Sequence, residues 1–183
     1  MKTWTKFLFG LFAVALVSGC TTIYGVAVDE RSVETIAADQ KIKAAILSKF
    51  VEDEQVKILD LGAYCYNGHV YVVGEYDQAK QRDRALEVAK SVKGVKSVSA
   101  YALPKKKNDS CGMKDNVSIH AKVKARLIGD KGIESTNVDI KVIQCRVVLL
   151  GIVETRGEID KSVAHARSVE GVREVKSFLR AAR

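Results

Sequence analysis

The chain has 183 residues, with 30 lysines and arginines against 22 aspartates and glutamates and a formal net charge of +8 at neutral pH. A length of this order admits one medium domain or two small ones. Its four cysteines include no Cys-x-x-Cys pair, and no His/Cys cluster has the spacing of zinc ligands, so we expect no metal site and no cofactor.

The N-terminus has the layout of an export signal. Lys2 and Lys6 precede an almost unbroken apolar run over residues 7–17. A run of about eleven residues is too short to cross a hydrocarbon core of roughly 30 Å as a helix. The segment is typical of the apolar region of a secretory signal.

The residue that follows this signal is Cys20. The run Val17-Ser18-Gly19-Cys20 resembles the lipobox of bacterial lipoproteins, in which the cysteine thiol receives a diacylglyceryl group before cleavage. The resemblance implies a signal peptide over 1–19 and a lipidated Cys20, since two or three acyl chains make a lasting membrane anchor. The alternative is an ordinary signal with a chance cysteine.

Export also determines the compartment and the binding partners that we expect for this protein. Thr21 follows the cysteine, where retention in an enterobacterial inner membrane would favour aspartate. We therefore expect a lipid anchor in the outer membrane, with the protein facing the periplasm. Nucleic acid is a poor partner because export removes the protein from it.

The mature chain contains an internal repeat at an offset of 77 residues. Gly74 and Gly151 each end a short β-like run, 70–74 and 147–151. Conserved glycine and apolar positions over some sixty residues without a gap indicate a tandem duplication. Further pairs at this offset are Ile42/Ile119, Ile46/Val123, Phe50/Leu127, Leu61/Val138, Leu86/Val163, Ala89/Ala166, Val92/Val169, Gly94/Gly171, Val95/Val172 and Val98/Val175.

Each repeat predicts the same order of elements. Apolar residues at four-residue spacing predict an amphipathic helix, as at Ile42, Ile46 and Phe50. Alternating segments then predict strands, joined by a hairpin at Asn67-Gly68 and by a weaker turn at Gln144-Cys145. A second helix over 78–92 or 155–169 ends near a glycine, and a last strand follows.

The predicted fold class is therefore α+β. It has two tandem α-β-β-α-β units, each with a three-stranded mixed sheet and two helices on one face. The expected boundaries are a tether over 20–37, a first unit over 38–103, a linker over 104–113 and a second unit over 114–183. The linker holds the chain's only proline and the run Lys105-Lys106-Lys107.

This arrangement resembles the BON domain, which occurs in tandem in periplasmic proteins and outer-membrane lipoproteins. The resemblance rests on the duplicated pattern, the valine-rich strands that close on glycine, and the elements 92–95 and 169–172. The segment 29–33, Asp29-Glu30-Arg31-Ser32-Val33, also looks like the Asp-x-Arg-Ser/Thr segment of such lipoproteins. The resemblance implies association with phospholipid membranes and support of outer-membrane integrity, without catalysis. The chain departs from the family at 116–120, where related lipoproteins often carry a tryptophan.

The two units differ in charge. Residues 20–111 hold 14 basic and 13 acidic residues, whereas residues 112–183 hold 14 basic and 9 acidic ones. The second unit is the better candidate for an anionic surface. In its first helix, with Ile119, Val123 and Leu127 turned inward, the outer side would carry Val117, Ala121, Lys124, Ala125 and Ile128. Lys122 would lie on its flank, and Arg126 would fall nearer the buried side and have to extend outward.

We therefore expect Lys122, Lys124, Arg126 and Ile128 to bind anionic phospholipid. Two alternatives concern this surface: it packs against the first unit, or its cations are simply solvated. A third concerns the whole protein, which would be an adaptor that docks on another envelope protein without binding lipid beyond its acyl anchor. The oligomeric state stays open.

Three cysteines remain besides Cys20, so they cannot all pair internally. Cys65 alternates with core-facing residues, and we expect it buried and reduced. Cys111 and Cys145 are then the pair that we expect to form a disulfide in an oxidising compartment; free thiols at both are the alternative. His69, His120 and His165 stand in no nucleophile or metal motif, so we expect no catalytic residues. Tyr64, Tyr66, Tyr71 and Tyr76 around the first hairpin favour cross-strand packing, with a ligand platform as the alternative.

Overall fold

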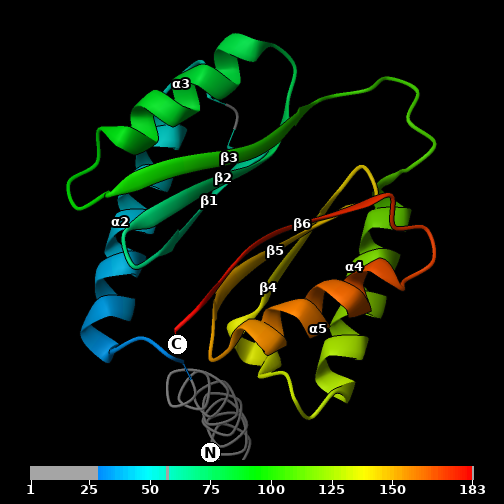
Figure 1. Cartoon of the computed structure of the whole chain (residues 1–183). Helices are drawn as coiled ribbons and strands as arrows, with labels where there is room; N and C mark the ends of the chain where they lie inside the picture. Colours follow the sequence, from blue (N-terminus) through cyan, green and yellow to red (C-terminus); the bar gives the residue numbers. More distant parts are fainter. Residues whose placement is uncertain (1–28, 57, 183) are drawn as a thin grey trace, which may run out of the picture.

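The computed structural model describes residues 29–56 and 58–182 and shows two units of the same architecture (Figure 1). The first unit consists of α2 (Val33–Glu52), β1 (Leu61–Tyr66), β2 (His69–Tyr76), α3 (Ala79–Lys90) and β3 (Ser97–Pro104). The second consists of α4 (Met113–Gly129), the 3₁₀ helix η1 (Ser135–Asn137), β4 (Asp139–Ile143), β5 (Arg146–Val153), α5 (Arg156–Arg167) and β6 (Glu174–Ala181). The predicted α+β class is confirmed.

Each sheet is mixed, as predicted. β2 pairs antiparallel with β1 and parallel with β3, and β5 pairs in the same way with β4 and β6. Gly74 and Gly151 lie in the central strands with φ of +155° and +141°. A Cβ at these positions would overlap the carbonyl oxygen of Asp60 or Asn137, which explains why both repeats carry glycine there.

Two helices begin elsewhere than the sequence analysis expects, and one short helix is additional. α2 begins at Val33, inside the expected tether, because the Ser32 hydroxyl accepts a hydrogen bond from the Thr35 amide and caps the helix. α4 begins at Met113, one residue inside the expected linker. η1 is an additional short helix before β4, which the alternating pattern of residues around 138–142 does not reveal.

The two sheets pack against each other through the faces that the helices leave uncovered. α2 and α3 cover one face of the first sheet, α4 and α5 cover one face of the second, and the two bare faces meet in the middle (Figure 1). A separate hydrophobic cluster fills this interface: Tyr66, Tyr71, Val73, Ile143, Val148, Leu150 and Ile152. The protein is therefore a four-layer α-β-β-α sandwich.

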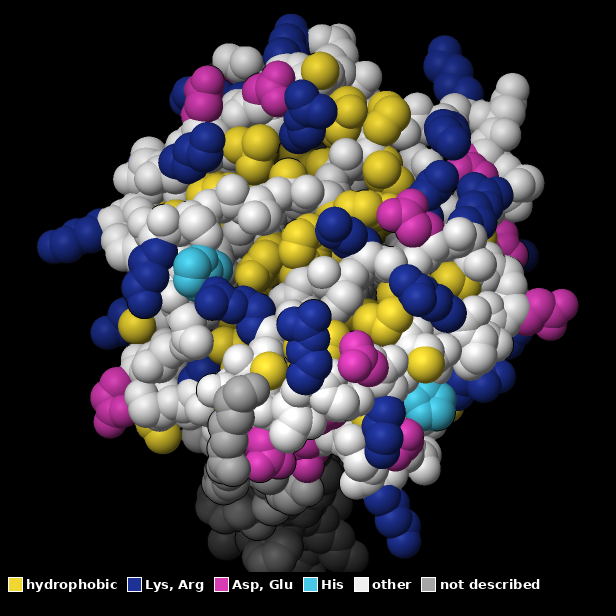
Figure 2. All heavy atoms as spheres, in the orientation of Figure 1, with side chains coloured by type: hydrophobic (Ala, Val, Ile, Leu, Met, Phe, Trp, Pro, Cys, Tyr) yellow, Lys and Arg dark blue, Asp and Glu magenta, His cyan; other side chains and the backbone are white. Residues whose placement is uncertain are grey.

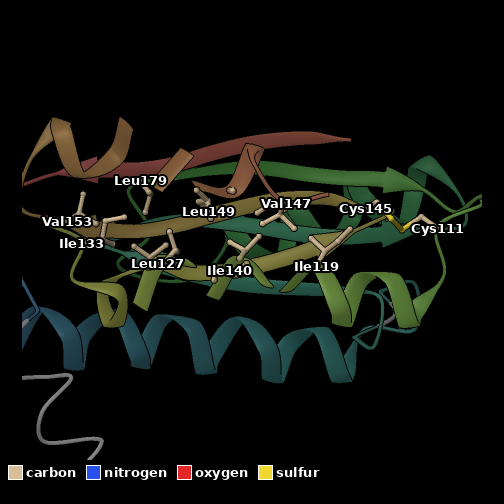
Figure 3. Close-up of a cluster of buried hydrophobic side chains, with 14 residues drawn as sticks. Cys111, Ile119, Leu127, Ile133, Ile140, Cys145, Val147, Leu149, Val153 and Leu179 are labelled. Carbon is tan, nitrogen blue, oxygen red and sulfur yellow. A yellow bond between two sulfur atoms is a disulfide. The ribbon is translucent and has the colours of Figure 1, made fainter. Parts of the chain in front are cut away.

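The central strands β2 and β5 are consequently buried on both faces. Val70 and Val72 point into the helix-side core, whereas Tyr71 and Val73 point into the interface between the sheets. In the second unit, Figure 3 shows Val147 and Leu149 of β5 directed at Ile119 and Leu127 of α4. The intervening residues of β5 belong to the interface.

Polar and aromatic contacts also join the two units. The Tyr71 and Phe178 rings lie 4.9 Å apart between their centroids. The Gln144 side-chain amide donates to the Glu75 carboxylate at 2.8 Å and to the Pro104 carbonyl at 2.9 Å. These contacts fix the turn between β4 and β5 against the ends of β2 and β3.

The sheet interface should carry a large share of the stability. We expect Leu150→Ala, a change at a fully buried interface residue, to lower the free energy of unfolding by about 2–5 kcal/mol through lost burial and the cavity left behind. Val51→Ala, at a side chain 67% exposed on α2, is the control and should change it by less than about 0.5 kcal/mol. Denaturant unfolding of both variants measures this, and equal effects would contradict the sandwich.

Candidate functional site

The outer face of α4 is an exposed, partly apolar surface. Ile119, Val123 and Leu127 are buried in the second core, so the helix turns its other side outward. On that outer side, Met113 is 83% exposed and Ile128 is 61% exposed, and Val117 lies exposed between them. Large apolar side chains at this spacing form an uncovered stripe along the helix.

Of the basic side chains of α4, Lys124 lies next to this stripe, and Lys122 and Arg126 lie farther round the helix. Lys122, Lys124 and Arg126 are all exposed. Lys124 falls beside the apolar stripe, while Lys122 and Arg126 stand one turn apart on the flank. The Arg126 guanidinium donates to the Ser168 hydroxyl at 3.0 Å, which holds it toward the end of α5.

The alternative that this face packs against the first unit is wrong. The units meet through their sheets, and α4 lies on the side of the second sheet that faces away from the first unit (Figure 1). On the face drawn in Figure 2, hydrophobic side chains show mainly as a band where the units meet, and Lys and Arg side chains are spread widely. Net charge alone therefore does not locate a binding surface.

A hollow of about 410 Å³ lies between the second half of α4 and the edge strand β4. It brings together Lys124 and Ile128 from the predicted site, but not Lys122 or Arg126. Its complete lining is His120, Lys124, Leu127, Ile128, Ser135, Thr136, Val138, Asp139, Ile140 and Lys141.

Two residues of this hollow, His120 and Lys141, were not predicted as site residues. Burial lowers the pKa of His120, and the nearby charges of Lys124 and Lys141 lower it further. The Lys141 ammonium lies 5.1 Å from the centre of the Tyr64 ring, a contact between the two units. No sequence pattern could predict the contact of Lys141 with Tyr64, because it depends on how the two units pack.

The predicted Asp-x-Arg-Ser segment is clamped to the first hairpin. The Arg31 guanidinium donates to the Asp29 carboxylate at 2.7 Å and to the Asp39 carboxylate at 2.8 Å, and it lies 5.1 Å from the centre of the Tyr66 ring. Burial would lower the pKa of Arg31, but the two carboxylates raise it above its ordinary value. The Tyr66 hydroxyl in turn donates to the Asp139 carboxylate of the second unit.

Asp39 is the centre of this clamp. Its carboxylate is buried and accepts hydrogen bonds from the Asn67 amide at 2.7 Å and the Gly68 amide at 2.8 Å. Burial alone would raise the pKa of Asp39, but these amides, the Cys65 thiol and Arg31 lower it below its usual value. Cys65 is buried and free, and burial beside the Asp39 carboxylate raises the pKa of its thiol to about 12.

The second unit ties the corresponding turn with a different set of bonds. Cys111 and Cys145 form a disulfide, with 5.8 Å between their Cα atoms. Asn116 occupies the position of Asp39 in the repeat, and its side-chain oxygen accepts from the Cys145 amide at 2.9 Å. Gln144 and Cys145 adopt φ of +50° and +57°, the left-handed conformation that Asn67 and Gly68 adopt in the first unit.

Cys20 lies outside the described residues. Among the helices that the structure describes, none is long and apolar enough to cross a membrane. Within residues 29–56 and 58–182, no group of three or more His, Cys, Asp or Glu side chains is arranged to hold a metal ion.

The clamp should make the free energy of unfolding depend on pH in the acidic range. A carboxyl whose pKa is lowered by folding stabilises the native state above its unfolded pKa, near 3.8, and loses that contribution as pH falls through the folded pKa. We expect Asp39→Asn to lower the free energy of unfolding by about 3–5 kcal/mol at neutral pH. The variant should also lose less stability than the parent between about pH 5 and about pH 2.

Urea unfolding across this pH range measures both effects. Asp160→Asn, at an exposed carboxylate, is the control and should follow the parent profile. A profile for Asp39→Asn parallel to that of the parent would contradict the role of the clamp.

The disulfide can be tested by peptide mapping. Without reductant, the oxidised mature protein should give a linked peptide containing Cys111 and Cys145, and Cys65 should react with alkylating reagents only after unfolding. The bridge spans 34 residues, so replacing both cysteines with serine should lower the free energy of unfolding by roughly 4 kcal/mol. Alkylation of both Cys111 and Cys145 in the unreduced protein would contradict the bridge, and the Cys111→Ser variant shows how a free Cys145 reacts.

Comparison with known proteins places the chain in a family. The model of the BON domain matches residues 38–102 and 115–183. The chain is 27% identical over 144 residues to osmotically-inducible protein Y of Escherichia coli, covering 78% of this chain and 72% of that protein. It is also 27% identical over 172 residues to the outer membrane lipoprotein DolP of Haemophilus influenzae, covering 93% of this chain and 88% of that protein.

Among solved structures, the C-terminal domain of CdsD from Chlamydia trachomatis aligns with a TM-score of 0.33 and 10% identity, over 79% of this chain and 67% of that one. That likeness is too weak to inform the fold. The match of the family model to both units agrees with the repeat, the sheet topology and the duplicated turns. The chain is a member of the BON domain family, with two BON domains in tandem.

Proposed function

We propose that this protein is an outer-membrane lipoprotein of the bacterial envelope that binds anionic phospholipid through α4 and supports the integrity of that membrane. The acylated Cys20 would provide attachment, and α4 would select the lipid. The observation that carries the proposal is the exposed stripe of Met113, Val117 and Ile128 on α4, with the exposed Lys124 next to it and no covering element among the described residues. Lys122 and Arg126 are also exposed, on the flank of the helix. The name of the Haemophilus influenzae relative supports the location.

The chemistry of this surface suits the headgroup region of an anionic bilayer. Apolar side chains on one face of a helix gain about 25 cal/mol for each square ångström that they bury in the acyl boundary. Each lysine or arginine near an anionic surface adds about 1 kcal/mol. Lys122, Lys124 and Arg126 together would therefore add about 3 kcal/mol.

The position of the tether agrees with this use of α4. The chain enters the described structure at Asp29, and the clamp fixes Arg31 against Tyr66, whose hydroxyl bonds Asp139. Asp139 also lines the hollow that Ile128 borders. Asp29 lies nine positions after Cys20 along the chain, a reach of at most about 30 Å. An anchor at Cys20 would hold the end of α4 that carries Ile128 near the membrane in which the acyl chains are inserted.

Vesicle co-sedimentation tests the proposal. The mature chain with Cys20→Ser should bind vesicles that contain phosphatidylglycerol or cardiolipin, should not bind neutral vesicles, and should lose affinity as salt rises. Replacing Lys122, Lys124 and Arg126 with serine should weaken binding about 100-fold, the equivalent of about 3 kcal/mol.

The matched control replaces Lys80, Lys90 and Lys93, three exposed lysines of the first unit, with serine. This control changes the net charge equally and should keep most of the affinity. Equal losses in both triple variants would show attraction to net charge alone. No binding by the folded parent protein would leave the acyl anchor as the only attachment and favour an adaptor that docks on another envelope protein.

A further inference from the structure

The lining of the hollow between α4 and β4 holds more positive than negative charge, with two lysines against the single carboxylate of Asp139. Lys124 and Lys141 line it. Lys43 of the first unit contacts the same Tyr64 ring as Lys141, with its ammonium 5.6 Å from the ring centre. Among the residues that the structure describes, none of these three lysines has a carboxylate within 4 Å. Such a cluster is unfavourable without an anion.

The one carboxylate in the lining is already engaged. Asp139 accepts the hydrogen bond of the Tyr66 hydroxyl, and burial together with Asp139 raises the pKa of that hydroxyl, so Tyr66 keeps its proton. The Asp139 carboxylate is thus directed toward the first unit by a bond that holds the two units together. It does not form an ion pair with Lys141 on the same strand.

Two groups in the hollow are held in place before any ligand arrives. Lys141 is held over the Tyr64 ring, and His120 has a hydrogen bond with the backbone of Ile140. His120 is half-buried, and this burial lowers the pKa of its imidazole, to which the charges of Lys124 and Lys141 add. Part of the lowering of this pKa thus comes from the two lysines. An anion bound between these groups would reverse that effect.

We propose that this hollow binds the phosphate group of a phosphate ester, with Lys124 and Lys141 as its cations and His120 as a third ligand. A volume of about 410 Å³ suits a small polar headgroup. The lipid source rests on the proposed function: Ile128 lines the same hollow and belongs to the exposed apolar stripe, so a phosphate seated here would place its acyl chains along α4. The anion would be the headgroup of a glycerophospholipid rather than free phosphate.

The first experiment follows the pKa of His120 by NMR in the mature chain with Cys20→Ser. Adding sn-glycerol 3-phosphate should raise the pKa of His120, because a bound phosphate offsets the charges of Lys124 and Lys141. Inorganic phosphate is a second soluble probe of the same chemistry. His69 and His165, which lie outside the hollow, should not respond, and an unchanged pKa of His120 with both probes would overturn the proposal.

Lys141→Ser should weaken the binding of glycerol phosphate about tenfold, as expected for the loss of one charge-assisted hydrogen bond. Lys176→Ser is the matched control: Lys176 also lies on a strand with its ammonium 5.3 Å from an aromatic ring, that of Phe178, but outside the hollow. The control should bind as the parent does. Equal affinity of the Lys141 variant and the parent would overturn the assignment.

Binding to vesicles distinguishes a lipid headgroup from free phosphate as the ligand of the hollow. If the lipid headgroup is the ligand, Lys141→Ser should also weaken binding to phosphatidylglycerol vesicles more than Lys176→Ser does. A response of His120 to soluble phosphate without this loss would support the phosphate site and overturn its lipid source. Failure of the proposed function has a different result, since the parent protein would then not bind vesicles at all, whatever His120 does in solution.

Discussion

The packing of the two sheets against each other is the constraint on which the rest of the structure depends. A three-stranded sheet with helices on one face has a second face to cover, and in both units that face is apolar at its centre. Tyr71 and Val73 from β2 meet Val148 and Leu150 from β5, so neither unit could expose its sheet to water at a low free-energy cost. Because the bare sheet faces cover each other, the surfaces left for ligands are the outer faces of the helices and the sheet edges.

This constraint explains how far the sequence predicts the fold. The repeat at an offset of 77 predicts the order of elements, the mixed sheets and the turns, because both copies follow the same local rules of helix spacing and strand alternation. The interface between the copies leaves no such signal, since a contact such as Tyr66 with Asp139 joins positions that are not equivalent. One indication was available: Val70–Val73 and Val147–Leu150 are apolar without alternation, as expected for strands buried on both faces.

The candidate site, like the fold, could be predicted from the sequence only in part. The exposure of Lys122, Lys124 and Ile128 follows from helical geometry once Ile119, Val123 and Leu127 are assigned to the core, so the outer face of α4 was predictable. The hollow beside it was not, because it needs β4 at the edge of its sheet and Tyr64 from the other unit to position Lys141. Sequence periodicity describes one element at a time, and the hollow is built from three.

The two units hold their equivalent hairpin turns with different bonds. In each unit, the segment before the first helix must be held against the turn of the hairpin. The first unit uses the ion pair of Arg31 with Asp39, whose carboxylate caps the Asn67-Gly68 turn. The second unit has Asn116 in place of Asp39 and adds a disulfide to Cys145, which lies in the turn itself. A disulfide of this kind persists in an oxidising compartment, which agrees with export.

In the proposed function, the clamp of the first unit links attachment at Cys20 to lipid binding by α4. Because Arg31 is fixed to Tyr66 and Tyr66 to Asp139, the end of the tether is held at the border between the units, next to the hollow. An anchored protein samples a small volume above the bilayer, so even a weak headgroup contact becomes effective through the high local concentration of lipid. Under this proposal, the affinity of α4 for lipid need not be high in solution. It needs only to favour one lipid composition over another once the anchor is in place.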